Sequence, residues 1–275
     1  MQPFATREPR FSFGRNWQSF RAHALDDERV RQARADLVAL AGPVGGATFL
    51  DVGSGSGLMS LAAIREGAAR VVSFDVDPDS VACTAKLRDG ASPDERARWE
   101  VLEGSALDER FVRGLGAFDV VYAWGVLHHT GDMWRAVENV LAPARDRLVL
   151  ALYNRVRGEL GTLSSESWRA IKRAYASGGR VRRGAMLATY LGWRLSIPLT
   201  KLRNPLRDVF AYRGSRGMSY VHDAIDWLGG YPYEFASADE VESIVHARGF
   251  RTVRALPSPF GGWGNNQFLF QRAAS

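Results

Sequence analysis

The chain has 275 residues, 46% of them hydrophobic and 24% charged, which is enough for one large domain or two small ones with a buried core. No apolar run approaches the roughly eighteen positions of a membrane span, and the arginine-bearing N-terminus lacks the apolar segment of a secretion signal. The single cysteine, Cys83, excludes an intramolecular disulfide and a cysteine-rich zinc site. We therefore expect a soluble, cytoplasmic protein that holds no metal ion.

The net charge of +6 is distributed unevenly along the chain. Only three of the 36 basic residues are lysines, a ratio that a GC-rich genome could produce as easily as a function. Residues 155–217 contain 14 basic and three acidic residues, a net charge of +11, so the rest of the chain carries −5. The basic excess therefore belongs to one segment, and a general affinity for nucleic acid does not follow from the total charge.

Residues 47–150 alternate short β-branched or apolar runs with helical patterns, which predicts stacked βα units and a parallel sheet. The predicted strands are 47–52, 70–75, 99–103, 118–124 and 147–152. The predicted helices between them are 57–66, 79–88, 108–114 and 132–141. A helix over 238–248 and strands over 250–256 and 265–271 complete an α/β fold with a seven-stranded, mostly parallel sheet and helices on both faces.

The basic segment reads as a helical insertion after the fifth strand, with helices over 164–177 and 182–202. Its second helix is apolar but interrupted by Arg194, so it is too short and too charged to span a membrane. It could be a lid over an acceptor pocket, a dimer contact, an interfacial helix on anionic lipid, or a solvated hairpin packed on the sheet. If the charge is functional, guanidinium groups favour phosphate or carboxylate on the acceptor.

A glycine-rich loop joins the first strand to the first helix of the sheet. Glycines at Gly53, Gly55 and Gly57 remove Cβ atoms where the backbone must turn sharply and approach a ligand. The G-x-G-x-G spacing, with Asp51 two residues ahead, differs from the G-x-G-x-x-G dinucleotide fingerprint and favours a ligand with an ammonium group over a pyrophosphate. Asp75 ends the second strand, 24 residues after Asp51, where an acid can accept hydrogen bonds from ribose hydroxyls.

Two further segments end strands at the same edge. The third strand runs into Gly104-Ser105-Ala106, and the fourth into the run Ala-Trp-Gly-Val-Leu-His-His at 123–129. Because the carboxyl ends of parallel strands share one edge, we expect these segments and the glycine loop to form a single ligand site.

These motifs resemble those of the class I S-adenosylmethionine-dependent methyltransferases, over most of 47–154 and 237–272. The resemblance implies a Rossmann-like fold with S-adenosylmethionine as cofactor. It also implies that Asp51 and the 53–57 loop hold the methionine moiety, that Asp75 holds the ribose, and that Ser105 and Ala106 lie at the adenine edge. Many relatives have Asp where this chain has Ser105, so adenine recognition would rely more on backbone groups. The expected cofactor contacts are Asp51, Gly53, Ser54, Gly55, Gly57, Asp75, Val76, Ser105, Ala106 and Trp124.

The opening segment, with Phe11, Phe13 and Trp17, resembles the N-terminal lid of some bacterial members, although these aromatic residues could instead cap the core. The domain boundaries expected are an N-terminal helical lid segment over 1–46, a cofactor-binding core over 47–154 and 237–275, and a basic and aromatic insertion over 155–236 that caps the acceptor site.

Methyl transfer requires a nucleophile that is brought close, oriented and often deprotonated. His128 and His129, just beyond the fourth strand, are candidates for the base, and the alternative for either is a packing or helix-start role. A second cluster, 219–233, carries aromatic rings with a few polar groups, as a pocket for a ring or sugar would. Its candidates to face a substrate are His222, Tyr231 and Tyr233, and the alternative is that this cluster only docks the insertion.

The segment after the fourth strand lacks the Asn/Asp-Pro-Pro-aromatic motif of amino-base methyltransferases. The covalent route to pyrimidine C5 would favour a proline before the cysteine, and Cys83 is not preceded by proline. Nucleic-acid base methylation is therefore disfavoured. The leading hypothesis is methylation of a small-molecule acceptor, with oxygen favoured over nitrogen as the methylated atom. A phosphorylated or carrier-linked metabolite is one candidate for this acceptor. Two alternatives stay open: an RNA methyltransferase that grips RNA with the insertion, and a non-catalytic or peripheral membrane protein that keeps the cofactor fold. The oligomeric state is left open.

Overall fold

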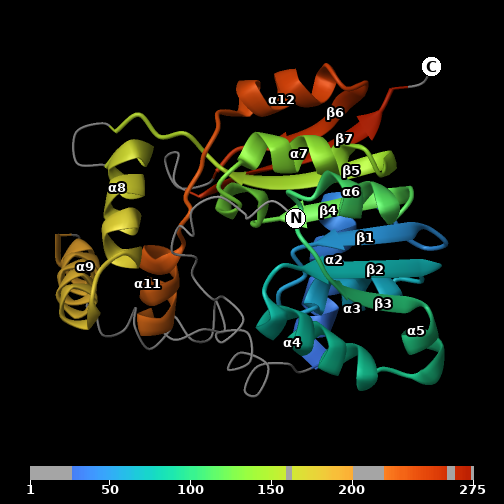
Figure 1. Cartoon of the computed structure of the whole chain (residues 1–275), viewed down its shortest axis with the longest axis horizontal. Coiled ribbons are helices and arrows are strands. Elements are labelled where there is room, and N and C mark those ends of the chain that lie inside the picture. The colour runs from blue at the N-terminus through green and yellow to red at the C-terminus, as the bar shows by residue number, and fades with distance from the viewer. Residues whose placement is uncertain (1–26, 159–162, 201–219, 259–263, 274–275) are drawn as a thin grey trace. The chain divides into compact units, whose positions relative to one another are not determined.

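The computed structural model describes residues 27–158, 163–200, 220–258 and 264–273 (Figure 1). The chain divides into two compact units. We call the first the core unit, which comprises the described residues 27–158, 234–258 and 264–273. The second is the helical unit, 163–200 and 220–233. The unit boundaries thus fall inside the predicted insertion, which the sequence placed at 155–236.

The core unit is built on a seven-stranded sheet of order β3-β2-β1-β4-β5-β7-β6 (Figure 1). Every neighbouring pair is parallel except β5 with β7 and β6 with β7. The predicted fold class is confirmed, and each strand lies within a few residues of its predicted range. The strands are β1 Thr48–Val52, β2 Arg70–Asp75, β3 Trp99–Glu103, β4 Phe118–Trp124, β5 Ala144–Tyr153, β6 Phe250–Leu256 and β7 Asn265–Arg272.

Two hydrophobic clusters cover the two faces of the sheet. Leu50 of β1 belongs to the cluster that includes α6, α7 and α12, whereas its neighbour Phe49 belongs to the cluster that includes α2, α3 and α4. Successive strand residues point to opposite faces, so both faces of the central strands are apolar, as a sheet buried on both sides requires. The helices of the core unit are α2 Asp27–Ala41, α3 Leu58–Arg65, α4 Pro78–Asp89, α5 Pro93–Ala97, α6 Glu109–Gly114, α7 Met133–Leu141 and α12 Ala238–His246, with a 3₁₀ turn η1 at Leu127–His129.

Polar side chains fix where several of these helices begin. Asp77 caps α4 ahead of Pro78, and Asp132 caps α7, each by accepting a backbone N–H of the first turn. Ser92 forms a capping box with Glu95 at the start of α5, a helix that the sequence prediction omitted. The sequence does contain a signal for this helix, since Ser92 and Glu95 have the S-x-x-E spacing of a capping box and Pro93 stands at the first helical position.

Helix α2 packs in the core, although the sequence analysis assigned its residues to the lid segment over 1–46. Val30, Ala33, Leu37 and Ala41 are buried in one cluster with the side chains of α3. Their spacing of three and four residues places them on one helix face. Phe11, Phe13 and Trp17, on which the lid prediction rested, lie outside the described residues.

The helical unit contains α8 Ser165–Ala176, α9 Arg180–Thr200 and α11 Tyr220–Gly229. The first two match the predicted helices, whereas α11 occupies a segment for which no helix was predicted. Among the residues that the structure describes, no helix is long and apolar enough to cross a lipid bilayer.

An aromatic cluster joins the three helices of this unit. The ring of Trp168 on α8 lies 5.9 Å from Tyr190 and 6.5 Å from Trp193, both on α9, and 5.3 Å from Trp227 on α11. Trp227 also lies 6.3 Å from Tyr233. The aromatic residues of 219–233 thus help to hold the helical unit together, and their abundance masked the helical spacing of α11.

Candidate cofactor site

The site lies where the strand order reverses, between β1 and β4. The loop after β1 meets the loop after β4 closely, because a Cβ atom on Gly53 would lie 2.1 Å from Cγ2 of Val126. Open α/β sheets bind ligands at this reversal point, outside the carboxyl ends of the strands. Glycine at position 53 is therefore required by the packing of the two loops as well as by backbone conformation.

The glycine loop takes a conformation that only glycine adopts easily. Gly53, Gly55 and Gly57 have φ angles of 71°, 53° and 78°, in the left-handed region. The backbone N–H groups of Gly53 and Ser54 both donate to the carbonyl oxygen of Phe74, at 2.8 and 3.1 Å. Gly57 caps α3, so the free N–H groups at the start of that helix face the loop.

Thr84 of α4 supports the loop from outside and was not singled out from the sequence. Its hydroxyl donates to the carbonyl of Gly55 at 3.3 Å, which leaves its oxygen to accept from Ser54 at 3.0 Å. A Cβ atom on Gly57 would lie 3.0 Å from the Thr84 side chain. The loop is therefore held in one shape by contacts with α4.

Asp75 stands at the end of β2 with both carboxylate oxygens directed by backbone donors. Oδ2 accepts the N–H of Gly55 at 3.0 Å, and Oδ1 accepts the N–H of Asp77 at 2.9 Å. Each oxygen keeps a further lone pair, so the carboxylate can still accept the two hydroxyls of a ribose. Burial raises the pKa of Asp75, an effect that these backbone hydrogen bonds partly offset.

Asp51 is buried beneath the loop, with only 3% of its surface exposed. Its Oδ2 accepts the hydroxyl of Ser60 at 2.5 Å; Ser60 lies 2.6 Å from the hydroxyl of Ser73, which accepts the indole N–H of Trp99 at 2.7 Å. Because an indole N–H can only donate, the chain of hydrogen bonds runs from Trp99 toward the carboxylate and supports its ionised form.

Burial nevertheless raises the pKa of Asp51 to about 7, and the negative charge of Asp75 adds to the rise. Ser60, Ser73 and Trp99 were not identified from the sequence, since a lone serine or tryptophan on an apolar strand or helix face carries no motif. The site therefore contains two neighbouring carboxylates, each with a raised pKa, beside the glycine loop.

The turn after β3 is also built from internal hydrogen bonds. Ser105 accepts the N–H of Leu107 at 3.2 Å, and the carbonyl of Ala106 accepts the side-chain amide of Asn139 on α7 at 2.8 Å. Asn139 is buried and was not predicted as a site residue. The Ser105 hydroxyl accepts in the turn and keeps its own hydrogen to donate to a ligand, whereas the carbonyls of Ser105 and Ala106 are both engaged within the protein.

Two large apolar side chains stand exposed at this edge. Val76, directly after Asp75, is 50% exposed, and Trp124, at the end of β4, is 43% exposed. Exposed apolar surface beside a carboxylate suits a ligand that joins a flat ring to polar groups. The predicted cofactor contacts therefore share one edge of the sheet and fit S-adenosylmethionine, with its adenine, ribose and amino-acid parts.

The two candidate histidines after β4 occupy different environments. His128 is only 1% exposed; its Nδ1 accepts the N–H of Tyr153 at 3.3 Å, and the two rings lie 3.9 Å apart. His129 is partly exposed, with its ring 4.5 Å from that of His128. His128 is therefore packed within the core unit, whereas His129 is partly accessible to solvent.

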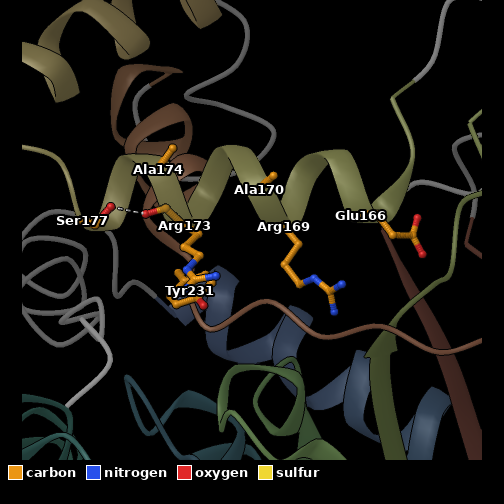
Figure 2. A pocket seen from close by; sticks show the side chains of 7 residues that line it. All are labelled: Glu166, Arg169, Ala170, Arg173, Ala174, Ser177 and Tyr231. Atoms are coloured by element: carbon orange, nitrogen blue, oxygen red, sulfur yellow. Dashed lines mark hydrogen bonds between the residues drawn. The ribbon is translucent and has the colours of Figure 1, made fainter. Parts of the chain in front are cut away.

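The other three catalytic candidates belong to the helical unit. His222 lies on α11, and its side chain is outside the described part of the structure. Tyr233 is buried beside Trp227, and this burial raises the pKa of Tyr233 to about 12. Tyr231 lines a pocket of that unit (Figure 2). The structure thus brings the predicted cofactor contacts together at one edge, whereas the catalytic candidates are divided between the two units.

Within the described ranges, no group of three or more His, Cys, Asp and Glu side chains is arranged to hold a metal ion. The chemistry that these residues can offer is hydrogen bonding, charge and proton transfer. Such groups suffice where a bound cofactor already carries the reactive group.

The sheet order, the glycine loop at the reversal point and the acid that ends β2 define a Rossmann-like nucleotide-binding domain. Residues 50–147 match the family described as "Methyltransferase domain". The structure of magnesium protoporphyrin IX methyltransferase from Synechocystis PCC 6803, solved with bound SAH, is similar over 94% of both chains at 15% identity, with a TM-score of 0.54. An O-methyltransferase family protein from Burkholderia thailandensis is similar over 96% of this chain and 62% of its own, at 15% identity and a TM-score of 0.52.

Residues 50–147 thus match a methyltransferase domain, and the fold is that of class I S-adenosylmethionine-dependent methyltransferases, one of them solved with bound SAH. Among curated proteins, the chain is similar to the ribosomal protein L11 methyltransferase of Lachnospira eligens, with 32% identity over 81 residues. That match covers 28% of this chain and 25% of the relative, so the chain spans about a quarter of that protein's length. The similarity locates the cofactor domain and leaves the acceptor to be argued from the site.

Proposed function

We propose that the protein transfers a methyl group from S-adenosylmethionine to a small-molecule acceptor, with oxygen favoured over nitrogen as the methylated atom. The observation that carries the proposal is the pair of carboxylates beside the glycine loop, Asp51 buried and Asp75 half-buried, each with a raised pKa. Burial is the main cause of both raised pKa values, and repulsion from a nearby carboxylate adds to each; a cationic ligand would favour the ionised carboxylates, whereas a pyrophosphate would disfavour them. S-adenosylmethionine carries positive charge on its sulfonium and ammonium groups.

Different residues of the chain would bind different parts of the cofactor. Asp75 would accept the ribose hydroxyls through the lone pairs that its backbone donors leave open. Val76 and Trp124 would lie against the adenine, and the backbone of Ser105 and Ala106 would meet its edge. The glycine loop, Gly53 to Gly57 with Ser54, would lie along the methionine part, with Asp51 supporting it electrostatically from below.

When bound, S-adenosylmethionine supplies a methyl group that its sulfonium already makes electrophilic. The acceptor's lone pair forms the new bond to that carbon while the carbon–sulfur bond breaks and its electron pair stays on sulfur. The protein's task is to orient the acceptor and receive its proton. His129 is the residue of the core unit that we propose for this proton, which then passes to solvent.

Two features of the chain favour a small-molecule acceptor: a motif that is absent after β4, and a cysteine that is buried. The segment after β4 has no Asn/Asp-Pro-Pro-aromatic motif with which to grip an exocyclic base amine. Cys83 is 2% exposed inside α4, so it cannot serve as a covalent nucleophile for pyrimidine C5. Both observations favour a small molecule over a nucleic-acid base.

The proposal is tested by incubating the purified chain with methyl-labelled S-adenosylmethionine and a cell extract separated into metabolites, RNA and protein. We expect label in the metabolite fraction with the wild type and none with Asp75→Ala. Label confined to the RNA fraction would replace a small-molecule acceptor with RNA. A chain that binds S-adenosylmethionine but labels no fraction would contradict the transfer activity.

A further inference from the structure

Four buried side chains of the core unit form a hydrogen-bond network that ends at Asp51. Asp51, Ser60, Ser73 and Trp99 are each at most 3% exposed. Asp51 of β1 pairs with Ser73 of β2, and Trp99 of β3 pairs with Val71, two residues before Ser73. Paired residues of neighbouring strands, and residues two apart on one strand, point to the same face of a sheet. Ser60 comes from α3, whose neighbouring residues pack on that face.

The indole at the far end of this network fixes the direction of its hydrogen bonds. The N–H of Trp99 can only donate, so the oxygen of Ser73 accepts it at 2.7 Å. The hydrogen of Ser73 then points to the oxygen of Ser60, 2.6 Å away, and the hydrogen of Ser60 points to Asp51 at 2.5 Å. Asp51 therefore faces a donor, which is the partner that an ionised carboxylate needs.

The same network opposes protonation of Asp51. Hydrogen bonds that run in one direction polarise one another, so the indole donor strengthens the two hydroxyl bonds beyond it. A protonated Asp51 would donate to Ser60, which would turn its own hydrogen to Ser73. The Ser73 oxygen would then receive two donors, while the Ser73 hydrogen would lose its acceptor in the network. Trp99, on the edge strand β3, thus favours the ionised form of a carboxylate two strands away.

Burial and neighbouring charge work in the opposite direction at Asp51. Burial is the main cause of its raised pKa, and the negative charge of Asp75 adds to the rise, whereas the hydrogen bonds of Ser60 lower that pKa. On the other side, Tyr122 of β4 pairs with Asp51. The buried hydroxyl of Tyr122 has no hydrogen-bond partner in the part of the chain that the structure describes, and the carboxylate of Asp36 on α2 also acts on it.

We propose that Ser60, Ser73 and Trp99 are positioning residues for the cofactor, which act through Asp51 by keeping its carboxylate ionised at neutral pH. The inference rests on the proposed function, because a cationic cofactor is what benefits from that charge. The three side chains are buried and hydrogen-bonded to one another, so they influence the cofactor through Asp51. Their substitution should therefore change the pH dependence of cofactor binding.

The direct test follows the carboxyl carbon of Asp51 by ¹³C NMR in the free protein, between about pH 5 and 9. The signal is assigned by its absence in Asp51→Asn. In the wild type, the indole N–H signal of Trp99 should shift with the same midpoint as the Asp51 carbon, because the two groups are the ends of one network. A Trp99 signal that stays constant while Asp51 titrates would overturn the inference.

Substitutions along the network should move that midpoint. Trp99→Phe and Ser73→Ala should each raise it by about one pH unit, and Ser60→Ala should raise it further, because Ser60 is the direct donor. The matched control is Tyr122→Phe, which removes a buried hydroxyl beside Asp51 that has no partner among the described residues, and should leave the midpoint unchanged. An unchanged midpoint in all three network variants, or an equal rise in the control, would overturn the inference.

Calorimetric titration of S-adenosylmethionine then tests the positioning role. At pH 7, near the pKa of Asp51, Trp99→Phe should bind about fivefold more weakly than the wild type, and the two should bind equally near pH 9, where Asp51 is ionised in both. An equal loss of affinity at every pH would show a structural role alone and would overturn the inference. A wild type that binds no S-adenosylmethionine would contradict the proposed function, and the NMR midpoints would still decide whether the network keeps Asp51 ionised.

Discussion

The carboxylate of Asp75 accepts the backbone N–H of Gly55 at 3.0 Å, which ties the end of β2 to the middle of the loop after β1. The acid proposed for the ribose and the loop proposed for the methionine part therefore form one hydrogen-bonded structure. Their relationship leads directly to the first prediction.

Asp75→Ala should weaken S-adenosylmethionine binding about 10- to 100-fold, because hydrogen bonds to a charged group contribute roughly 1.5–3 kcal/mol. Part of the lost affinity comes from the missing hydrogen bonds to the ribose. The rest comes from the loop around Gly55, which loses its hydrogen bond to Asp75. The measurement is calorimetric titration of the cofactor. Asp89→Ala, which removes an exposed acid at the end of α4, is the matched control and should leave the affinity unchanged.

Gly53→Ala should abolish cofactor binding, because its Cβ atom would collide with Val126 and displace the loop. Gly116→Ala is the matched control: Gly116 has a similarly positive φ of 85°, but a Cβ atom there meets nothing within 4 Å. Each variant carries a backbone cost of about 1–2 kcal/mol. If thermal unfolding and cofactor titration showed the same modest effect in both variants, the close approach of the two loops would be wrong.

S-adenosylmethionine binding should weaken as the pH falls below about 7 and should release protons when measured near pH 6. The reason is that Asp51, with a pKa of about 7, is protonated there in the free protein, whereas a cationic ligand favours its ionised form. Calorimetry in buffers of different ionisation enthalpy measures the released protons. Asp51→Asn should bind more weakly at pH 8 and release no protons; an unchanged release would show that another group titrates.

The same raised pKa predicts how stability varies with pH. Between about pH 4 and 7 the folded state binds a proton at Asp51 that the unfolded chain has lost, so the contribution of Asp51 to stability falls as the pH rises and is constant above about 7. As the pH rises across this range, the free energy of unfolding of Asp51→Asn, measured with urea, should therefore increase relative to that of the wild type. A constant difference between the two proteins would contradict the raised pKa.

The adjacent histidines should respond oppositely to substitution. His128→Ala should lower the stability by about 2 kcal/mol, since it removes a buried ring and the acceptor of the Tyr153 N–H. His129→Ala should leave thermal unfolding and cofactor affinity nearly unchanged while slowing transfer about 100-fold or more, the range of general base catalysis. Unchanged turnover in the His129 variant would remove it from the chemistry.

The sheet could be predicted from the sequence because its central strands are short, nearly continuous apolar runs, as a sheet buried on both faces requires. Asp51 and Asp75 could be placed at its edge because they stand at fixed offsets from the glycine loop. Helix α11 could not be predicted from the sequence, because its aromatic residues and flanking glycines resemble an irregular segment. Its helical state depends on the packing of Trp227 against Trp168.

The supporting residues of the site depend on contacts between elements far apart in sequence. Ser60, Ser73 and Trp99 lie on α3, β2 and β3, and only the fold joins them into one hydrogen-bonded chain to the carboxylate of Asp51. The different burial of His128 and its neighbour likewise follows from the turn η1, which has no sequence signature. Tertiary contacts of this kind leave no periodic pattern in the chain.

The most direct measurement of the central claim is a paired calorimetric titration of the wild-type chain with S-adenosylmethionine and with NAD. The account predicts one S-adenosylmethionine site of micromolar affinity, lost in Gly53→Ala, and no detectable binding of NAD, whose pyrophosphate would meet two carboxylates. No heat from S-adenosylmethionine, or tighter binding of NAD, would contradict it.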